Sequence, residues 1–334
     1  MSNEHDPGPD VAGARANTIE TAAAEPIPAA EDGAIRIGTA SWTDPTMTAA
    51  GIFYPQGADS AEERLNYYAN QFPLVEVDAT YYALPARRTA ELWVERTPPD
   101  FTFDVKAHAV MTTQPTETKR LPKDIREALP EELKAKPRIY GKDLPAELYD
   151  EMWTRFLDGL EPLRESGQLG SILLQFPRWF FPSNENRELI EFAQERLGDV
   201  KCAIEFRNGT WFNEKNVERT LRWLADHELP LVLVDEPQGL RTSVPPIVAV
   251  TSPDLAIVRF HGRRAETWEA RGVPPVERFR YLYSRDELEE WVPRVRQVAT
   301  EAKDVHVLMN NCYANYGSTN ARELAALLQE LDVA

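Results

Sequence analysis

Residues 201–207 read Lys-Cys-Ala-Ile-Glu-Phe-Arg, and they decide the fold through their spacing. In an extended strand, one face would carry Cys202, Ile204 and Phe206, and the other Lys201, Glu205 and Arg207. Strands of a parallel sheet that are buried on both faces normally consist of apolar runs. A charged second face therefore indicates a barrel strand, with helices outside and polar side chains inside.

Similar short segments recur along the chain and alternate with amphipathic stretches. The predicted strands are 35–42, 74–82, 101–108, 171–177, 200–208, 231–235, 255–263 and 305–311. The predicted helices are 61–72, 87–96, 148–165, 185–197, 214–227, 285–302 and 319–331. A helix after the sixth strand is only weakly indicated, because residues 240–250 hold two prolines. This alternation over about 300 residues favours a single (β/α)8 TIM barrel, with an open doubly wound sheet as the alternative.

Two parts of the chain fall outside the alternation. Residues 1–33 are rich in Ala, Pro, Gly and acids and lack aromatic residues, which predicts a disordered tail and leaves 34–334 as the barrel domain. A polar, Pro-rich insert at residues 112–147 follows the third strand. Connections of this length are usually functional lids or disordered, so its role stays open.

The chain is strongly acidic and poor in lysine. Its net charge is −17, and its 37 basic residues comprise 28 Arg and 9 Lys. Such a surface suits a salt-loaded cytoplasm and hence a halophilic source, and equally an acidic protein kept monomeric by its charge. Either way, a broad nucleic-acid-binding surface is disfavoured, while nucleic acid bound only in a local cleft stays open.

Cysteine use and the N-terminus indicate the compartment. Cys202 and Cys312 are expected to be free thiols in a reducing cytoplasm. No signal peptide is recognisable, and the apolar runs are far shorter than the ~20 residues of a membrane span. We therefore expect a cytoplasmic protein without a membrane partner. No CxxC, HExxH or nucleotide-cofactor motif occurs, so the cofactor stays unknown, with a divalent metal as one candidate.

Candidate functional side chains gather at the C-terminal ends of the predicted strands, where barrels carry their sites. The candidate catalytic residues are Lys106, Glu205, Asp235 and His261. The candidate substrate-binding residues are Trp42, Tyr81, Gln175, Arg207, Trp211, Arg259, Arg263, Asn310, Asn311, Gly317 and Ser318. A metal could use Glu76, Asp78, Glu205 and His261. The structural alternative is a salt-bridge ladder inside the barrel, such as Glu205 with Arg259.

Several of these segments carry a family resemblance. The matching stretches are 37–42, 53–55, 63–69, 75–82, 103–107, 173–177, 205–207 with 211–212, 258–262, 309–311 and 320–321. In this order they resemble domain-of-unknown-function family 72, the YecE-like proteins. The resemblance implies a TIM barrel and no established reaction. The chain departs from the family pattern at Asp78 and His108 and in the long insert.

The residue types at the strand ends favour an anion as the ligand. Arginine forks such as that of Arg207 match phosphate oxygens. The backbone amides of Gly317 and Ser318, before the last helix, would add an anion seat, unless Ser318 or Thr319 only caps that helix.

Carboxylates beside this basic cluster predict acid–base chemistry. Glu205 and Asp235 would serve as general base and acid, with His261 as an alternate proton carrier. We expect a hydrolase or lyase acting on a small phosphate-bearing substrate, either a sugar phosphate or a nucleic-acid phosphodiester. A glycosidase is one alternative, disfavoured because Gln175 ends strand four where a carboxylate is usual. A non-catalytic anion-binding module is the other.

Overall fold

The computed structural model describes residues 15, 23–29, 32–49, 51–270 and 272–330. The chain divides into two compact units, one made of Met1–Glu76 with Phe212–Ala334, the other of Val77–Trp211. The fold is α/β, and its eight parallel strands form a nearly closed (β/α)8 barrel, as the sequence predicted.

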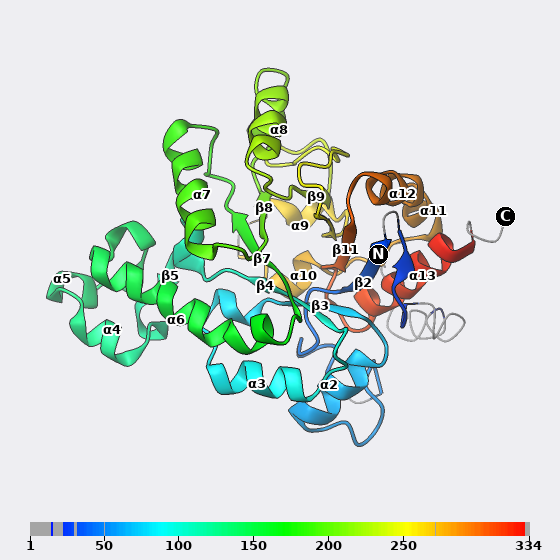
Figure 1. Ribbon diagram of the computed structural model, residues 1–334, viewed down its shortest axis with the longest axis horizontal. Coiled ribbons are helices and arrows are strands. Elements are labelled where there is room, and N and C mark those ends of the chain that lie inside the picture. The colour runs from blue at the N-terminus through cyan, green and yellow to red at the C-terminus, as the bar shows by residue number, and fades with distance from the viewer. Residues whose placement is uncertain (1–14, 16–22, 30–31, 50, 271, 331–334) are drawn as a thin grey trace. The chain divides into compact units, whose positions relative to one another are not determined.

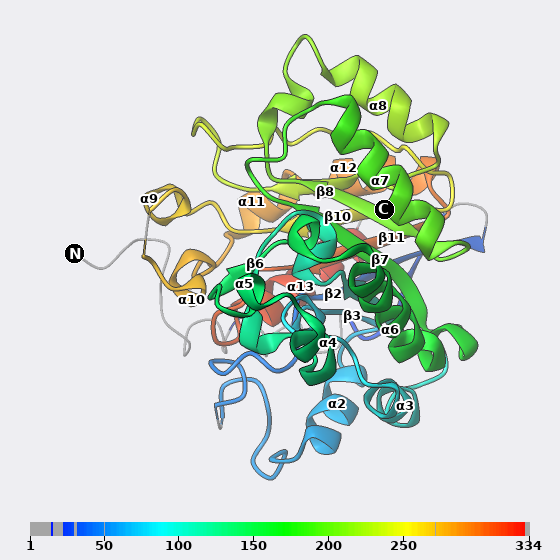
Figure 2. The same cartoon turned by 90° about the vertical axis from the view of Figure 1, so that its left-hand side faces the viewer.

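The first unit holds five of the barrel strands. They are β2 (Ala34–Thr39), β3 (Leu74–Val77), β9 (Val232–Asp235), β10 (Leu255–Phe260) and β11 (Asp304–Met309). They pair in the order β3-β2-β11-β10-β9 (Figures 1 and 2). The pairing of β2 with β11, in which Thr39 lies opposite Met309, joins the first and last strands of the barrel. Because an open doubly wound sheet does not join these strands, that alternative is wrong.

Helices of this unit follow the predicted positions in part. They are α2 (Ala61–Ala69), α8 (Val217–Asp226), α9 (Ala265–Trp268), α10 (Pro275–Arg278), α11 (Arg285–Glu289), α12 (Val292–Glu301) and α13 (Tyr316–Glu330). Of these, α9 and α10 lie where no helix was predicted. No helix forms at 236–254, where the prolines weakened the prediction. The predicted helix 285–302 is two helices, with Trp291 at the break. The last helix begins at Tyr316, three residues before the predicted start.

The second unit holds the remaining three barrel strands. β4 (Thr102–Lys106), β7 (Leu169–Phe176) and β8 (Cys202–Phe206) pair in the order β4-β7-β8. Its main helices are α3 (Arg87–Glu95), α6 (Ala146–Glu165) and α7 (Asn184–Leu197), and α3 packs on α6. The outward residues Cys202, Ile204 and Phe206 are buried, as the alternation predicted for a helix-covered face.

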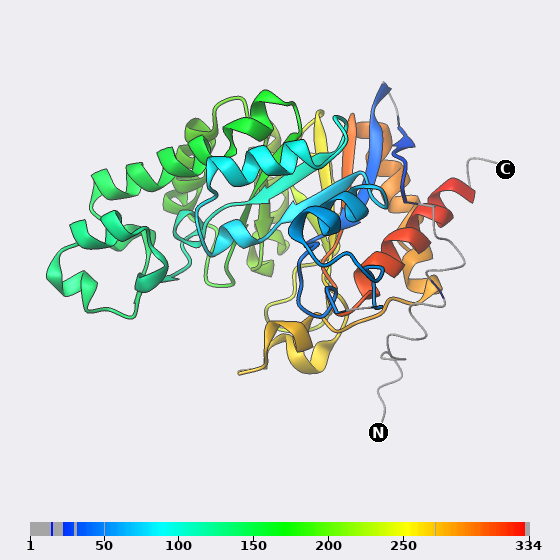
Figure 3. The same cartoon turned by 90° about the horizontal axis from the view of Figure 1, so that it is seen from below.

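The insert after β4 is folded, which excludes disorder, one of the two alternatives for it. It contains β5 (Thr116–Glu117) paired antiparallel with β6 (Arg138–Ile139), and the short helices α4 (Lys123–Ala128) and α5 (Glu131–Lys134), which lie near the start of α6 (Figures 1 and 3). Buried apolar side chains recur at every fourth position, at Leu121, Ile125, Leu129 and Leu133. The insert therefore buries apolar side chains although its composition is polar.

Several predicted strands end earlier than expected. The second stops at Val77, and Ala79–Tyr81 forms a 3-10 turn instead. The Thr80 hydroxyl donates to the Val77 and Lys106 carbonyls at 3.1 and 2.6 Å, which draws the chain into a turn. Glu76 therefore stays on a strand, and Asp78 does not. Arg207, His261 and Arg263 likewise lie just beyond the ends of β8 and β10.

Most of the predicted N-terminal tail lies outside the described residues. Within the described part, β1 (Ile27–Pro28) pairs antiparallel with β2, and Ile27 is 2% exposed. β3 pairs with β2 only at Gly38 and Thr39. Nearer the start of β2, Ile35 pairs with Ile27 of β1. Ile27 and Pro28 therefore belong to the sheet, although the predicted barrel domain begins only at residue 34.

Two other predictions concern single features. Cys202 and Cys312 are free thiols, as predicted. Among the described residues, no helix is long and apolar enough to cross a membrane.

Candidate active site

A buried carboxylate lies at the centre of the candidate site in the second unit. Glu205, near the end of β8, has 0% of its side chain exposed. Gln175 on β7 is its register partner and donates its amide Nε2 to Glu205 Oε1 at 2.8 Å. Arg207 reaches the same oxygen at 3.1 Å. These two donors fix the orientation of the carboxylate.

A second group of contacts connects this carboxylate to Lys106 at the end of β4. The Lys106 ammonium lies 5.0 Å from the centre of the Tyr81 ring. The Tyr81 hydroxyl donates to Gln114 Oε1 at 2.9 Å, and Gln114 Nε2 donates to the Gln175 carbonyl at 3.0 Å. Burial raises the pKa of Tyr81 to about 12, so its hydroxyl stays protonated as a donor. Five predicted site residues are therefore brought together here: Tyr81, Lys106, Gln175, Glu205 and Arg207.

Arg207 differs from the buried groups around it in its accessibility. Its side chain is 20% exposed, whereas that of Glu205 is not exposed at all. The guanidinium thus reaches from a buried carboxylate to the solvent. Such a group can orient an anion from solution while it remains anchored from behind.

The first unit contains a different carboxylate cluster, around Asp235 at the end of β9. Arg263 donates to both Asp235 oxygens, through Nε at 3.0 and 3.2 Å and through NH2 to Oδ2 at 2.8 Å. The Tyr283 hydroxyl and the Trp291 indole donate at 2.7 Å each. A carboxylate with this many donors is a structural anchor, so the geometry favours a positioning role for Asp235 over the predicted proton transfer.

The donors around Asp235 are held as firmly as the carboxylate. Arg263 also contacts Glu290 at 2.8 Å and Glu287 at 3.7 Å, so carboxylates surround its charge. Burial, followed by the neighbouring Asp235 charge, raises the pKa of Tyr283 well above its ordinary value. Tyr283 therefore stays a neutral donor. The prediction that Arg263 binds substrate is not supported by this geometry, because its guanidinium is occupied by acidic partners.

Two further pairs of predicted site residues lie in the first unit. Asn310 Nδ2 lies 2.8 Å from His261 Nδ1, just beyond β11 and β10, and His261 is buried. Arg259 on β10 pairs with Glu76 on β3 at 2.8 Å, and their side chains are 1% and 0% exposed. The salt-bridge alternative therefore holds for Arg259, with Glu76 as a partner.

Some predicted binding residues serve the fold instead. Trp211 is buried, stacks on Phe206 with ring centres 4.2 Å apart, and donates its indole to the Phe180 carbonyl at 2.8 Å. It is a core residue, so the prediction that it stacks on a ligand is wrong. Asn311 is also buried and donates to the Tyr281 carbonyl and to Asn320, which ties two loops together. Trp42 is 8% exposed, which leaves little of its ring for a ligand.

The anion seat predicted before the last helix falls within the first turn of that helix. Because α13 begins at Tyr316, Gly317 and Ser318 lie in its first turn rather than in a preceding loop. Ser318 is 2% exposed and donates its hydroxyl back to the Asn315 carbonyl at 3.0 Å. Neither Ser318 nor Thr319 therefore stands at the position of a helix cap.

The predicted metal ligands do not form a recognisable metal site. In the part of the chain that the structure describes, no group of three or more His, Cys, Asp or Glu side chains is arranged to hold a metal ion. Asp78 starts a 3-10 turn, and Glu76 lies beside Arg259. His108, another histidine at a strand end, is buried, and its Nδ1 accepts from the Val110 amide at 3.4 Å. Burial lowers the pKa of His108 to about 4, which marks it as a neutral structural side chain.

The two strand-end clusters occur on a fold that known proteins share. A family model described as "Protein of unknown function DUF72" matches residues 36–333. The chain belongs to the DUF72 family. The UPF0759 protein YunF of Bacillus subtilis is 32% identical over 297 residues, which cover 88% of this chain and 94% of that protein. The UPF0759 protein YecE of Escherichia coli K12 is 28% identical over 202 residues, 60% of this chain and 59% of that protein.

Solved structures of DUF72 proteins have the same fold. A DUF72 family protein from Thermotoga maritima is 30% identical, with a TM-score of 0.68 over 88% of this chain and 99% of that one. One from Enterococcus faecalis is 29% identical, with a TM-score of 0.70 over 88% of this chain and 95% of that one. These similarities establish the family and the barrel. They assign no reaction.

Sequence reasoning missed three residues that hold these clusters together. Gln114 lies in the insert, and its two hydrogen bonds connect Tyr81 with Gln175. Tyr283 and Trp291 lie in the long connection after β10 and at the break before α12. Gln114 and Tyr283 lie outside the predicted strands and helices, where no periodic pattern identifies the direction of a side chain, and Trp291 lies where the predicted helix 285–302 breaks.

Proposed function

We propose that this DUF72 protein is an enzyme that acts on a phosphate-bearing substrate, with Lys106, Gln175, Glu205 and Arg207 as its active site. The observation that carries the proposal is the Glu205–Arg207 pair, in which a fully buried carboxylate holds a guanidinium that is 20% exposed. Arg207 and Lys106 would bind the phosphate oxygens, because both present cationic donors at the ends of β8 and β4, the two strands that flank β7.

The remaining groups would supply acid–base chemistry. Glu205 would transfer the proton during hydrolysis or lysis, and Gln175 would orient it through the hydrogen bond at 2.8 Å. A bound phosphate would compete with Glu205 for Arg207 and thereby change the affinity of that carboxylate for a proton. Sugar phosphates and nucleic-acid phosphodiesters share this chemistry. A nucleic acid would bind only in the cleft of the site and not over a broad surface. A cytoplasmic location is in keeping with the free thiols.

Two other functions predict different results at the same residues. A retaining glycosidase needs two carboxylates about 5 Å apart. The register partner of Glu205 is the amide Gln175, so this pair does not supply them. A non-catalytic anion-binding module would use the same cationic groups without turnover, and only an activity assay separates it from the enzyme.

The experiment compares wild type with Arg207→Ala in thermal melts, with and without phosphate at constant ionic strength. We expect phosphate to raise the melting temperature of the wild type and not that of the variant. Arg164→Ala, at an exposed ion pair of the same unit, is the control and should keep the phosphate response. If the wild type ignores phosphate and Arg207→Ala loses about 3–5 kcal/mol, Arg207 is only the partner of a buried charge and the proposal fails.

Turnover is tested separately with a panel of phosphatase, nuclease and glycosidase substrates. Glu205→Gln should abolish the activity that the wild type shows and retain the phosphate-dependent rise in melting temperature. Phosphate binding without turnover on any phosphate substrate would favour the anion-binding module.

A further inference from the structure

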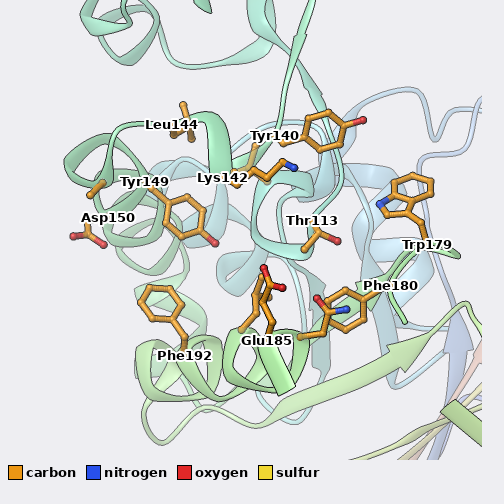
Figure 4. A pocket seen from close by; sticks show the side chains of 15 residues that line it. Thr113, Tyr140, Lys142, Leu144, Tyr149, Asp150, Trp179, Phe180, Glu185 and Phe192 are labelled. Atoms are coloured by element: carbon orange, nitrogen blue, oxygen red, sulfur yellow. The ribbon is translucent and has the colours of Figure 1, made fainter. Parts of the chain in front are cut away.

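A large cavity lies within the second unit, and Glu205 is not among the residues that line it. Its volume is about 980 Å³, and its walls come from the insert, the beginning of α6, residues 179–180 and α7. Figure 4 shows Tyr140 and Lys142 on one side and Phe180, Glu185 and Phe192 on the other. This volume is typical of pockets that enclose a small organic ligand. Nothing in the proposed phosphate chemistry uses it.

Aromatic rings dominate the walls and the mouth of this cavity. Trp179 is 49% exposed and Tyr140 is 37% exposed, and both line it. Phe181, next to the lining residue Phe180, is 54% exposed. Among the described residues, the exposed large hydrophobic side chains all belong to this unit. Aromatic surface left open to water beside a cavity indicates a binding site, because its burial by a ligand is favourable.

Two opposite charges face the cavity from different elements. Lys142 belongs to the 3-10 turn Gly141–Asp143 of the insert, and Glu185 lies in the first turn of α7. Within the described part of the chain, neither forms an ion pair, whereas the lining residue Asp150 pairs with Arg196. The cavity thus offers one cation and one anion, on opposite walls, to whatever enters it (Figure 4).

Backbone strain marks the same cavity wall. Thr113 lines the cavity in the left-handed conformation, with φ 59° and ψ 17°, which is a rare state for a β-branched residue. Its Oγ1 is buried and has no hydrogen-bond partner among the described residues. Strain and an unsatisfied hydroxyl each cost stability, and such features concentrate where a ligand is bound.

We propose that this cavity binds a zwitterionic ligand with an aromatic body, namely a short aromatic peptide with free ends. Lys142 would bind the peptide carboxylate and Glu185 the ammonium. One side chain would pack between Tyr140, Trp179 and Phe180, and a second against Tyr149 and Phe192, whose rings stack 6.2 Å apart. The proposal gives the insert a function, since the insert supplies Lys142 and Tyr140.

The test uses four forms of one dipeptide in isothermal titration calorimetry. Phe-Phe carries both charges, N-acetyl-Phe-Phe only the carboxylate, Phe-Phe-amide only the ammonium, and N-acetyl-Phe-Phe-amide neither. We expect each removed charge to weaken binding about fivefold, the effect of a partly exposed ion pair. Equal binding of all four forms would overturn the charge assignment, and no binding by folded wild type would overturn the site.

Variants assign each charge to its residue. Lys142→Met should bind Phe-Phe and Phe-Phe-amide equally, because the carboxylate has lost its partner. Glu185→Gln should bind Phe-Phe and N-acetyl-Phe-Phe equally. Lys123→Met, at an insert lysine paired with Glu127 outside the cavity, is the matched control and should discriminate among the peptides as wild type does. If the control variant and Lys142→Met behave alike, Lys142 does not contact the ligand.

Discussion

Gln175 and Glu205 lie directly opposite each other on β7 and β8, and the amide of Gln175 donates to the carboxylate of Glu205 at 2.8 Å. An amide is the side chain that suits this position, since it neutralises no charge and still satisfies a buried oxygen. A second carboxylate here would face Glu205 at hydrogen-bond distance. Replacing Gln175 by a carboxylate should therefore lower stability whenever both facing groups are ionised.

The variant Gln175→Glu should accordingly be sensitive to pH. Two facing carboxyl groups repel when both are ionised, so their pKa values rise in the folded protein. The folded state then binds more protons than the unfolded state, and stability falls as pH rises through this range. Urea unfolding at pH 5 and pH 8 should show the larger loss at pH 8. Gln175→Met is the control, with a loss of about 1.5–3 kcal/mol and no such added pH dependence.

The Glu76–Arg259 pair should behave as a buried ion pair. Arg259→Met leaves the fully buried Glu76 carboxylate without this cation, and we expect a loss of about 3–5 kcal/mol in urea unfolding. The double variant Glu76→Leu with Arg259→Met should recover most of that loss, because two apolar side chains need no partner. A double variant less stable than either single variant would show that the pair has a further role.

Removing a hydrogen-bond donor of Asp235 tests whether this carboxylate stabilises the fold. Tyr283→Phe removes one donor at 2.7 Å from a buried charge, and the expected loss is about 1.5–3 kcal/mol. Tyr82→Phe, at a tyrosine that is 47% exposed, is the matched control and should change stability by at most about 0.5 kcal/mol. Similar denaturation midpoints for the two variants would contradict the anchoring role of Asp235.

Face alternation accounts for how much of the site the sequence predicted. Lys106 and Glu205 end strands whose apolar faces are buried under helices, so their direction follows from the period of two. Gln114 and Tyr283 lie in irregular segments, where direction depends on turns that the sequence does not specify. Trp211 was misassigned because an aromatic residue after a strand has the same pattern whether it packs on Phe206 or faces a ligand.

The insert shows where a compositional argument fails. Its lysines, glutamates and prolines are typical of disordered segments, yet Leu121, Ile125, Leu129 and Leu133 recur every fourth residue and are buried. A few well-spaced apolar side chains outweigh the average polarity, because burial depends on position rather than on composition. The cavity beside it had no sequence signal, since its walls come from segments some forty residues apart, such as Tyr140 and Trp179.

His108 should make the protein less stable in mild acid. Its pKa is lowered from 6.5 to about 4 by burial, so between these values the unfolded state binds the proton more readily. Stability from this group is complete above pH 6.5 and is lost as pH falls toward 4, by at most about 3 kcal/mol. In urea unfolding, His108→Gln should show a smaller loss from pH 7 to pH 4.5 than wild type. An unchanged pH dependence would mean that other groups dominate acid unfolding.

Thr113 is expected to destabilise the folded protein. Its left-handed backbone costs about 1–2 kcal/mol in a residue with a Cβ, and its buried hydroxyl lacks a partner among the described residues. Thr113→Gly removes both penalties at a smaller cost in chain entropy of about 0.5–1 kcal/mol, so the variant should be more stable by about 1 kcal/mol. The neighbouring Thr112 is the matched control, because its hydroxyl donates to the Ala109 carbonyl at 3.2 Å inside the 3-10 turn. Thr112→Gly should lose about 1–2 kcal/mol in the same urea titration. If both glycine variants are destabilised equally, the backbone of Thr113 is not strained, and the wall of the cavity does not destabilise the fold.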